Sequence, residues 1–340
     1  MIRRMALIAT ISLALAACGQ QSGRDYIKIV GSSTVYPFST VVAEQMVNQN
    51  PSLKTPVIES TGTGGGMKLF CGGVGVEHPD IADASRPMTP SEYETCRANG
   101  VDGIMKIQVG VDGIAFAESN EGPKFALSTA QIYKALAANP MGKPNPYKFW
   151  DDIDPSLPHQ PIQVFGPPST SGTRDALAEL ILAKGCEEVD PQAASLEGDA
   201  FDERCKRIRE DGAYVDKGEN DNMIVQNLNV SPNAIGIFGY SYLEENRDRI
   251  HGITIDGVEP TYKNIASGDY PGSRPLFIYV KKQHLDAVPG IKQFLDEYAE
   301  SWGPKGPLVA KGMIAAPESV RAQSRKIIDQ GITLDPSTLK

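Results

Sequence analysis

Three turns rich in glycine and hydroxyl side chains carry the residues whose types could do chemistry. They are Gly31-Ser32-Ser33-Thr34, the run 61–66 and the run 169–173. Glycines let backbone N–H groups approach a ligand closely, hydroxyl groups donate further hydrogen bonds, and a helix N-terminus adds a partial positive charge. Together these features suit a tetrahedral oxyanion. Taken singly, each turn could equally be ordinary helix capping, which uses the same residue types.

The elements that must position these turns alternate between strands and helices. Residues 27–30, 56–59 and 162–165 read as strands, and each runs into one of the three turns. Apolar residues at helical spacing follow, as with Phe38, Val42 and Met46 after the first turn. Further strands are expected at 113–117, 234–240 and 276–280, and further helices at 129–136 and around 291–298. This order predicts an α/β fold.

The first residues read as an export signal with a lipid attachment site. Two arginines precede an apolar run from Met5 to Ala17, which is too short to span a membrane as a helix. Leu15-Ala16-Ala17-Cys18 resembles the lipobox of bacterial lipoproteins, so we expect a signal peptide at 1–17, lipidation of Cys18 and a tether at 18–25. The alternative is an ordinary signal peptide cleaved near Ala17, with Cys18 incidental.

Four cysteines remain once Cys18 is assigned to lipid, an even number in an exported chain. Four cysteines allow three pairings, and the one that closes short local loops joins Cys71 with Cys96 and Cys186 with Cys205. A zinc site would compete for these thiols. Its usual Cys and His spacings are absent from the sequence, so we expect no bound metal and no cofactor.

The formal net charge of the 340-residue chain is −9, which argues against nucleic acid as a partner. It does not decide between ligand classes, because a small anion is held by local hydrogen bonds and helix ends rather than by overall charge. The composition of the chain is therefore compatible with an anionic ligand.

Several segments, taken together and in order, resemble the phosphate-binding proteins of phosphate ABC transporters. The resemblance covers nearly all of the chain after the signal. The segments that carry it are 30–37 (VGSSTVYP), 62–68 (GTGGGMK), 80–87 (DIADASRP), 171–174 (SGTR), 220–226 and 233–240.

The resemblance implies a type II periplasmic-binding-protein fold: two lobes, each a mixed sheet flanked by helices, joined by two hinge crossings. Carried over, one lobe comprises 26–112 plus 276–340 and the other 113–275. It also implies a protein that is monomeric, is not an enzyme, lies outside the cytoplasm on a lipid anchor, and passes phosphate to the permease subunits. The ligand-binding residues that it implies are Ser33, Thr34, the Val35 backbone N–H, Thr63, Ser171, Gly172 and Thr173.

Two positions depart from the family pattern. Arg86 stands where many members have Asp, and Pro167 stands where many have Arg. We therefore expect the cation of the cleft to be Arg86 or Arg174, unless Arg86 serves instead in a structural ion pair with Asp83. The carboxylate that accepts the proton of hydrogen phosphate would be Asp83 or Asp221.

Two other functions compete with phosphate binding. A carrier of another oxyanion, such as sulfate or molybdate, could use the same glycine and hydroxyl turns. A secreted serine hydrolase would need a general base, and the sequence has neither a G-x-S-x-G elbow nor a histidine in a recognisable triad setting.

Overall fold

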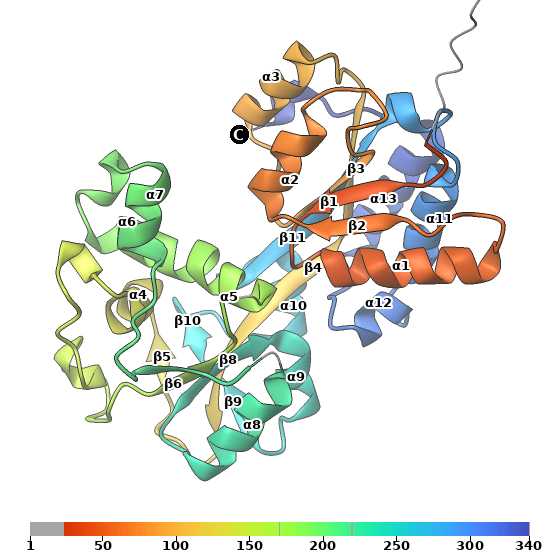
Figure 1. The fold of residues 1–340 in the computed structure, drawn as a ribbon. Coiled ribbons are helices and arrows are strands. Elements are labelled where there is room, and N and C mark those ends of the chain that lie inside the picture. The colour runs from red at the N-terminus through yellow and green to blue at the C-terminus, as the bar shows by residue number, and fades with distance from the viewer. Residues whose placement is uncertain (1–23, 170, 219, 340) are drawn as a thin grey trace, which may run out of the picture.

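The computed structural model describes residues 24–169, 171–218 and 220–339. The expected signal peptide and the lipidation at Cys18 therefore lie outside the described residues. Figure 1 shows two lobes, one above the other, with the long strand β4 running between them. Within the described residues, no helix combines the length and the apolar character needed to cross a bilayer.

The first lobe is built on a mixed sheet in the order β2-β1-β3-β11-β4. The first three strands are parallel, and β11 runs antiparallel to both β3 and β4. The strands are β1 (Lys28–Gly31), β2 (Val57–Ser60), β3 (Ile81–Ala84), β4 (Ile104–Ser119) and β11 (Ser273–Lys281).

Helices cover both faces of this sheet, because its strands carry apolar side chains on both sides. Ile81 packs in one apolar cluster with α1 and α11, whereas the adjacent Ala82 packs in another with α2 and α3. The helices of the lobe are α1 (Tyr36–Gln49), α2 (Thr63–Phe70), α3 (Pro90–Ala98), α11 (Ile291–Ser301), α12 (Pro307–Ala310) and α13 (Glu318–Gln330). The expected apolar stripe of α11 is buried, from Ile291 through Tyr298, as the helical spacing predicted.

The second lobe has its own mixed sheet. The second half of β4 pairs antiparallel with β8 and β9, and β6 lies parallel between β8 and β7. The strands are β6 (Val164–Gly166), β7 (Tyr214–Asp216), β8 (Ile235–Gly239) and β9 (Ile250–Gly252), with a separate pair β5 (Ala126–Leu127) and β10 (Thr254–Ile255). The expected α/β fold with a mixed sheet and helices in each lobe is confirmed.

A long helical segment leads away from the third hydroxyl turn. It begins as α5 (Gly172–Ala176), continues through a π-helical stretch, η3 (Leu177–Leu182), and ends as α6 (Ala183–Val189). Further helices of the lobe are α4 (Thr129–Leu136), α7 (Gly198–Phe201), η5 (Asp202–Lys206), α8 (Asp221–Val230), α9 (Tyr240–Glu245) and α10 (Tyr262–Ser267), besides the three short helices η1 (Pro140–Gly142), η2 (Trp150–Asp152) and η4 (Ala193–Ser195).

The strand β4 belongs to both lobes. It pairs with β11 up to Gly113, opposite Ser273, and with β8 from Ile114, opposite Gly239. The two chain crossings lie side by side, since the N–H of Ile114 donates to the carbonyl oxygen of Gly272 at 2.9 Å. The sequence predicted a strand only at 113–117, because the pattern carries no sign that one strand serves two sheets.

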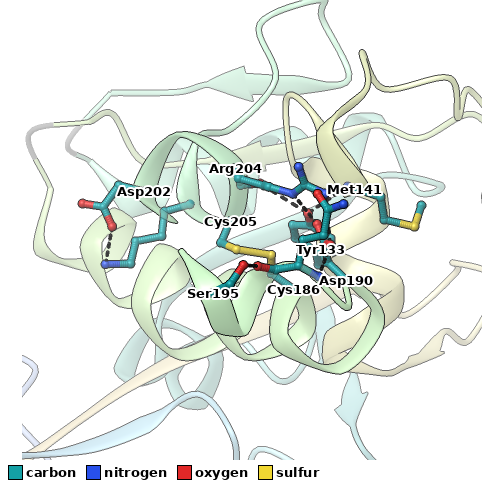
Figure 2. Close-up of a disulfide and its surroundings, with 10 residues drawn as sticks. Tyr133, Met141, Cys186, Asp190, Ser195, Asp202, Arg204 and Cys205 are labelled. Carbon is teal, nitrogen blue, oxygen red and sulfur yellow. Dashed lines mark hydrogen bonds and ion pairs between the residues drawn. A yellow bond between two sulfur atoms is a disulfide. The ribbon is translucent and has the colours of Figure 1, made fainter. Parts of the chain in front are cut away.

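Both expected disulfides are present. Cys71–Cys96 ties the end of α2 to α3, and Cys186–Cys205 ties α6 to η5. Figure 2 shows the second bridge beside an ion pair between Arg204 and Asp190, whose NH2 to Oδ1 distance is 3.0 Å. Both cysteines of this second bridge are fully buried. The bridge therefore fastens the segment between them to the core.

Replacing Cys186 and Cys205 together by Ala should lower the free energy of unfolding of this lobe by about 3 kcal/mol, because the bridge closes a loop with a sequence separation of 19. Urea unfolding of wild type and variant, both without reductant, measures the difference. The Cys71→Ala/Cys96→Ala variant is the matched comparison, and it should lower the free energy of unfolding of the other lobe by a similar amount. Equal stability of wild type and variant would contradict this role for the bridge.

Candidate functional site

The first hydroxyl turn connects β1 to α1 and is shaped by Gly31. A β-carbon on Gly31 would lie 2.1 Å from the carbonyl oxygen of Asp83, so only glycine lets β1 end this close to β3. Ser32 is buried, and its Oγ accepts from the N–H groups of Thr34 at 3.2 Å and Val35 at 3.4 Å. These bonds hold the turn just before α1, and Ser33 and Thr34 line the cavity between the lobes.

The third hydroxyl turn brings the other lobe to the same place. Ser171 caps α5, since its Oγ accepts from the N–H of Thr173 at 3.2 Å. A β-carbon on Gly172 would lie 2.6 Å from Thr34 Oγ1 and 3.0 Å from Thr34 Cα. Glycine is therefore required for the two turns to meet. A second contact between the lobes joins Ser33 Oγ to Asp175 Oδ2 at 2.8 Å.

A cavity of about 480 Å³ lies where these turns meet. Six of the residues expected at the site line it: Ser33, Thr34, Ser171, Gly172, Thr173 and Asp221. Its charged lining also includes Asp112, Glu245 and Lys311, which the sequence did not single out. The cavity thus combines hydroxyl and backbone donors from both lobes with the start of α1, which suits an anion, and with carboxylates that can accept a proton.

Asp221 begins α8 and contacts the neighbouring strand. Its Oδ2 accepts from the N–H of Gly239 at 3.1 Å. Of the two carboxylates expected as proton acceptors, it is the one that lines the cavity.

Asp83 lies inside the first lobe instead. Its side chain is 1% exposed, and its Oδ1 accepts from Ser39 Oγ at 3.0 Å, which in turn lies 2.8 Å from the hydroxyl of Tyr298. Burial raises the pKa of this carboxyl to about 8, and the hydrogen bond from Ser39 opposes the rise only in part. Asp83 is thus protonated at neutral pH and packed behind α1.

Thr63 and Arg86 lie on a different side of the cleft. Thr63 Oγ1 accepts from the N–H of Ser85 at 3.1 Å. Arg86 donates to both carboxylate oxygens of Glu92, at 3.0 and 2.8 Å, so its ion-pair partner is Glu92 and not the expected Asp83. Arg86 lines a second interlobe cavity of about 480 Å³, together with Ser85, Glu179 and Arg274.

Two further expected site residues are not part of the lining of the first cavity. Arg174 donates to the carbonyl oxygen of Pro167 at 3.3 Å and lies over the ring of Tyr214, 4.2 Å from its centroid. Val35 is buried, and its N–H is directed to Ser32 Oγ. The structure therefore brings the first and third turns together but leaves the second turn and both expected arginines outside the lining of the first cavity.

The cation that does contact the two turns is Arg274, at the start of β11. Its NH2 donates to Thr34 Oγ1 at 2.8 Å and to the carbonyl oxygen of Gly172 at 3.2 Å, so it touches one turn from each lobe. Sequence reasoning missed Arg274. The signal that could have found it is its place just before the strand expected at 276–280, where the chain returns between the lobes.

The residues that line the first cavity do not support the alternative of a serine hydrolase. All four histidines are among the described residues, and each is directed to an acidic partner outside the first cavity. Among the described residues there is also no group of three or more His, Cys, Asp or Glu side chains that could hold a metal ion.

Comparison with known proteins gives consistent results. The PBP superfamily domain matches residues 16–301. Protein SphX of Synechococcus elongatus is 30% identical, with 98% of this chain and 94% of that protein covered. Phosphate-binding protein PstS of Staphylococcus saprophyticus is 27% identical, with 95% and 92% covered. These names describe no enzyme, as expected for this chain.

A solved structure agrees with this result. The crystal structure of a possible phosphate binding protein from Planctomyces limnophilus is 31% identical and superposes with a TM-score of 0.73. The match covers 91% of this chain and 99% of that one. The type II two-lobed fold expected from the resemblance is thus confirmed.

The buried carboxyl of Asp83 should make stability depend on pH. Between about pH 4 and pH 8 the folded protein keeps a proton that the unfolded chain releases, so this group lowers the free energy of unfolding as pH rises, by up to about 1.4 kcal/mol per pH unit. Asp83→Asn lacks this proton release. Its stability relative to wild type should improve steadily from pH 5 to pH 7.5 in urea unfolding.

Ser39→Ala provides the companion measurement, because it removes the hydrogen bond that favours the charged form of Asp83. The fall of stability with pH should then extend to higher pH than in wild type. A difference between Asp83→Asn and wild type that stays constant with pH would refute the protonated state.

Proposed function

Because the chain belongs to the PBP superfamily, we propose that it captures inorganic phosphate between its two lobes and delivers it to an ABC transporter. The observation that carries this proposal is the meeting of the Ser33-Thr34 turn with the Ser171-Gly172-Thr173 turn at one cavity. Each turn comes from a different lobe, so a bound anion would be enclosed from both sides. The phosphate-binding names of the relatives support the choice of anion.

The ligand contacts follow from the chemistry of the cavity lining. In the proposed complex, the hydroxyl groups of Ser33, Thr34, Ser171 and Thr173 and the backbone at Gly172 donate to the phosphate oxygens. The N-terminus of α1 and that of the long helical segment starting at Gly172 add partial positive charge. Arg86 lines the second cavity, and Thr63 is hydrogen-bonded to Ser85, which also lines it, so both would complete the site only from that side.

Selectivity for phosphate would come from Asp221. At neutral pH phosphate still carries a proton, whereas sulfate is a fully ionised dianion with acceptors only. A carboxylate placed next to the protonated oxygen of phosphate accepts a hydrogen bond from it. The same carboxylate would be repelled by an oxygen of sulfate, which has no proton to donate. Asp221 lines the cavity and belongs to an element close to the cleft turns, which supports this role.

We also propose the cellular setting. The chain would be exported, cleaved before Cys18 and anchored by lipid outside the cytoplasmic membrane, with the permease subunits as partners and the protein itself monomeric. The two buried disulfides support an oxidising compartment. The lobes would comprise 26–112 plus 276–340 and 113–275, and they would close on phosphate by bending at the two adjacent crossings.

Titration calorimetry of the purified mature protein tests the ligand. Phosphate and arsenate should bind, and sulfate or molybdate in large excess should not compete, because a mismatched oxyanion leaves buried polar groups unsatisfied at a cost of about 10⁴ in affinity. Asp221→Asn should reduce the ratio of phosphate affinity to sulfate affinity. Glu245→Gln, which changes another carboxylate of the same cavity, should leave that ratio unchanged. Competition by sulfate at concentrations comparable to phosphate would favour a general oxyanion carrier.

Mass analysis tests the anchor. The protein extracted from membranes should carry an acylated Cys18 as its first residue, because Leu15-Ala16-Ala17 precede it as in a lipobox. Cys18→Ser should release the protein into the soluble fraction. An unmodified mature N-terminus on either side of residue 18 would reject lipidation and leave phosphate binding untouched.

A further inference from the structure

Arg274 is placed where the two lobes and the hinge meet. It is the second residue of β11, the strand that carries the chain back to the first lobe. Its side chain is 3% exposed, and it contacts four groups. Thr34 belongs to the first lobe and Gly172 to the second, so a single guanidinium group holds one anion-binding turn of each lobe.

The two carboxylates that pair with Arg274 differ in their surroundings. Asp112 lies on β4 at the crossing, accepts from Nε at 3.2 Å and has a side chain that is 18% exposed. Glu179 lies on the long helical segment of the second lobe, accepts from NH1 at 2.7 Å and has a side chain that is 43% exposed. Asp112 can therefore fix the arginine to the hinge, whereas Glu179 remains in contact with water and can be exchanged at little cost.

The charge balance around Arg274 favours such an exchange. The guanidinium group of Arg274 pairs directly with two carboxylates, so these three groups carry one negative charge in excess, which the nearby charge of Arg86 offsets only from a distance. A phosphate anion entering beside Thr34 would meet the repulsion of Glu179 unless that carboxylate gives up its place on NH1. Because a planar guanidinium can bind phosphate oxygens through two parallel N–H groups, phosphate is a suitable replacement for a carboxylate.

The arginines expected from sequence have other partners. Arg86 is bound through both of its terminal nitrogens by Glu92, and Arg174 is held by Pro167 and the ring of Tyr214. Lys311 lines the first cavity, but no described contact joins it to either turn. Arg274 lines the second cavity and contacts the Thr34 and Gly172 turns directly. We propose that Arg274 latches the two lobes through these turns and is the cation of the phosphate site, with Glu179 as an internal anion that bound phosphate displaces. The second half of this inference rests on the proposed function.

Calorimetry with inorganic phosphate tests the exchange through two variants that should change the phosphate affinity in opposite directions. Arg274→Met should weaken phosphate binding about thirtyfold or more, which is the size of a lost charged contact. The affinity of Arg274→Lys should lie between those of wild type and Arg274→Met, since lysine keeps the charge but lacks the planar group. Glu179→Gln should tighten binding about threefold to fivefold, because the competing anion is gone. Glu187→Gln, on α6 beside the same second cavity, is the matched control and should bind as wild type.

The sign of the Glu179→Gln effect separates this proposal from a purely structural role. A carboxylate that only positions Arg274 would weaken binding when replaced, and that result would overturn the exchange. Wild-type affinity in both Arg274→Met and Glu179→Gln would overturn the assignment of the cation.

The latch has its own measurement, which does not depend on any ligand. Small-angle X-ray scattering of dialysed protein should give a larger radius of gyration for Arg274→Met than for wild type, since the lobes keep the Ser33–Asp175 contact but lose the bonds from Arg274 to both turns. An unchanged radius would overturn the latch. If wild type bound no phosphate but Arg274→Met still expanded, the proposed function would fail and the latch would stand.

Discussion

The contact between Thr34 and Gly172 sets the geometry of the whole cleft. Neither turn could approach the other if residue 172 carried a β-carbon, and the side chain of Arg274 donates to both partners of this contact. The surrounding lining follows from it, because α1 begins directly after the first turn and the long helical segment begins at the second. The proposed anion site between the lobes rests on the meeting of these two helix ends.

An acidic chain can offer such a site because its negative charges are separated from the donors by local pairing and burial. Glu92 is held by Arg86, and Glu179 and Asp112 are held by Arg274. Asp83 is neutral near pH 7, since its pKa is raised by burial within the first lobe. Pairing and protonation lower the repulsion from these groups, and what remains at the cavity is set by its own carboxylates, Asp112, Asp221 and Glu245, rather than by the net charge of −9.

The crossings between the lobes explain why one arginine can serve both. The strand β4 continues from one sheet into the other, and β11 starts beside the point where β4 changes partners. A residue at the start of β11 is therefore close to the turns of both lobes. Asp112 lies opposite Arg274 on β4, which fixes the arginine to the hinge itself.

The sequence by itself determined the local features. The α/β order, the apolar stripe of α11, the two disulfide pairs and the identity of the hydroxyl turns were all predicted, because periodicity, turn chemistry and short cysteine loops act over a few residues to a few tens of residues. Only the tertiary structure decided which side chains meet across the cleft. Arg274 is separated from Thr34 by 240 positions and from Gly172 by 102. Over such separations, contact depends on how the strands cross between the lobes, and no local pattern records that.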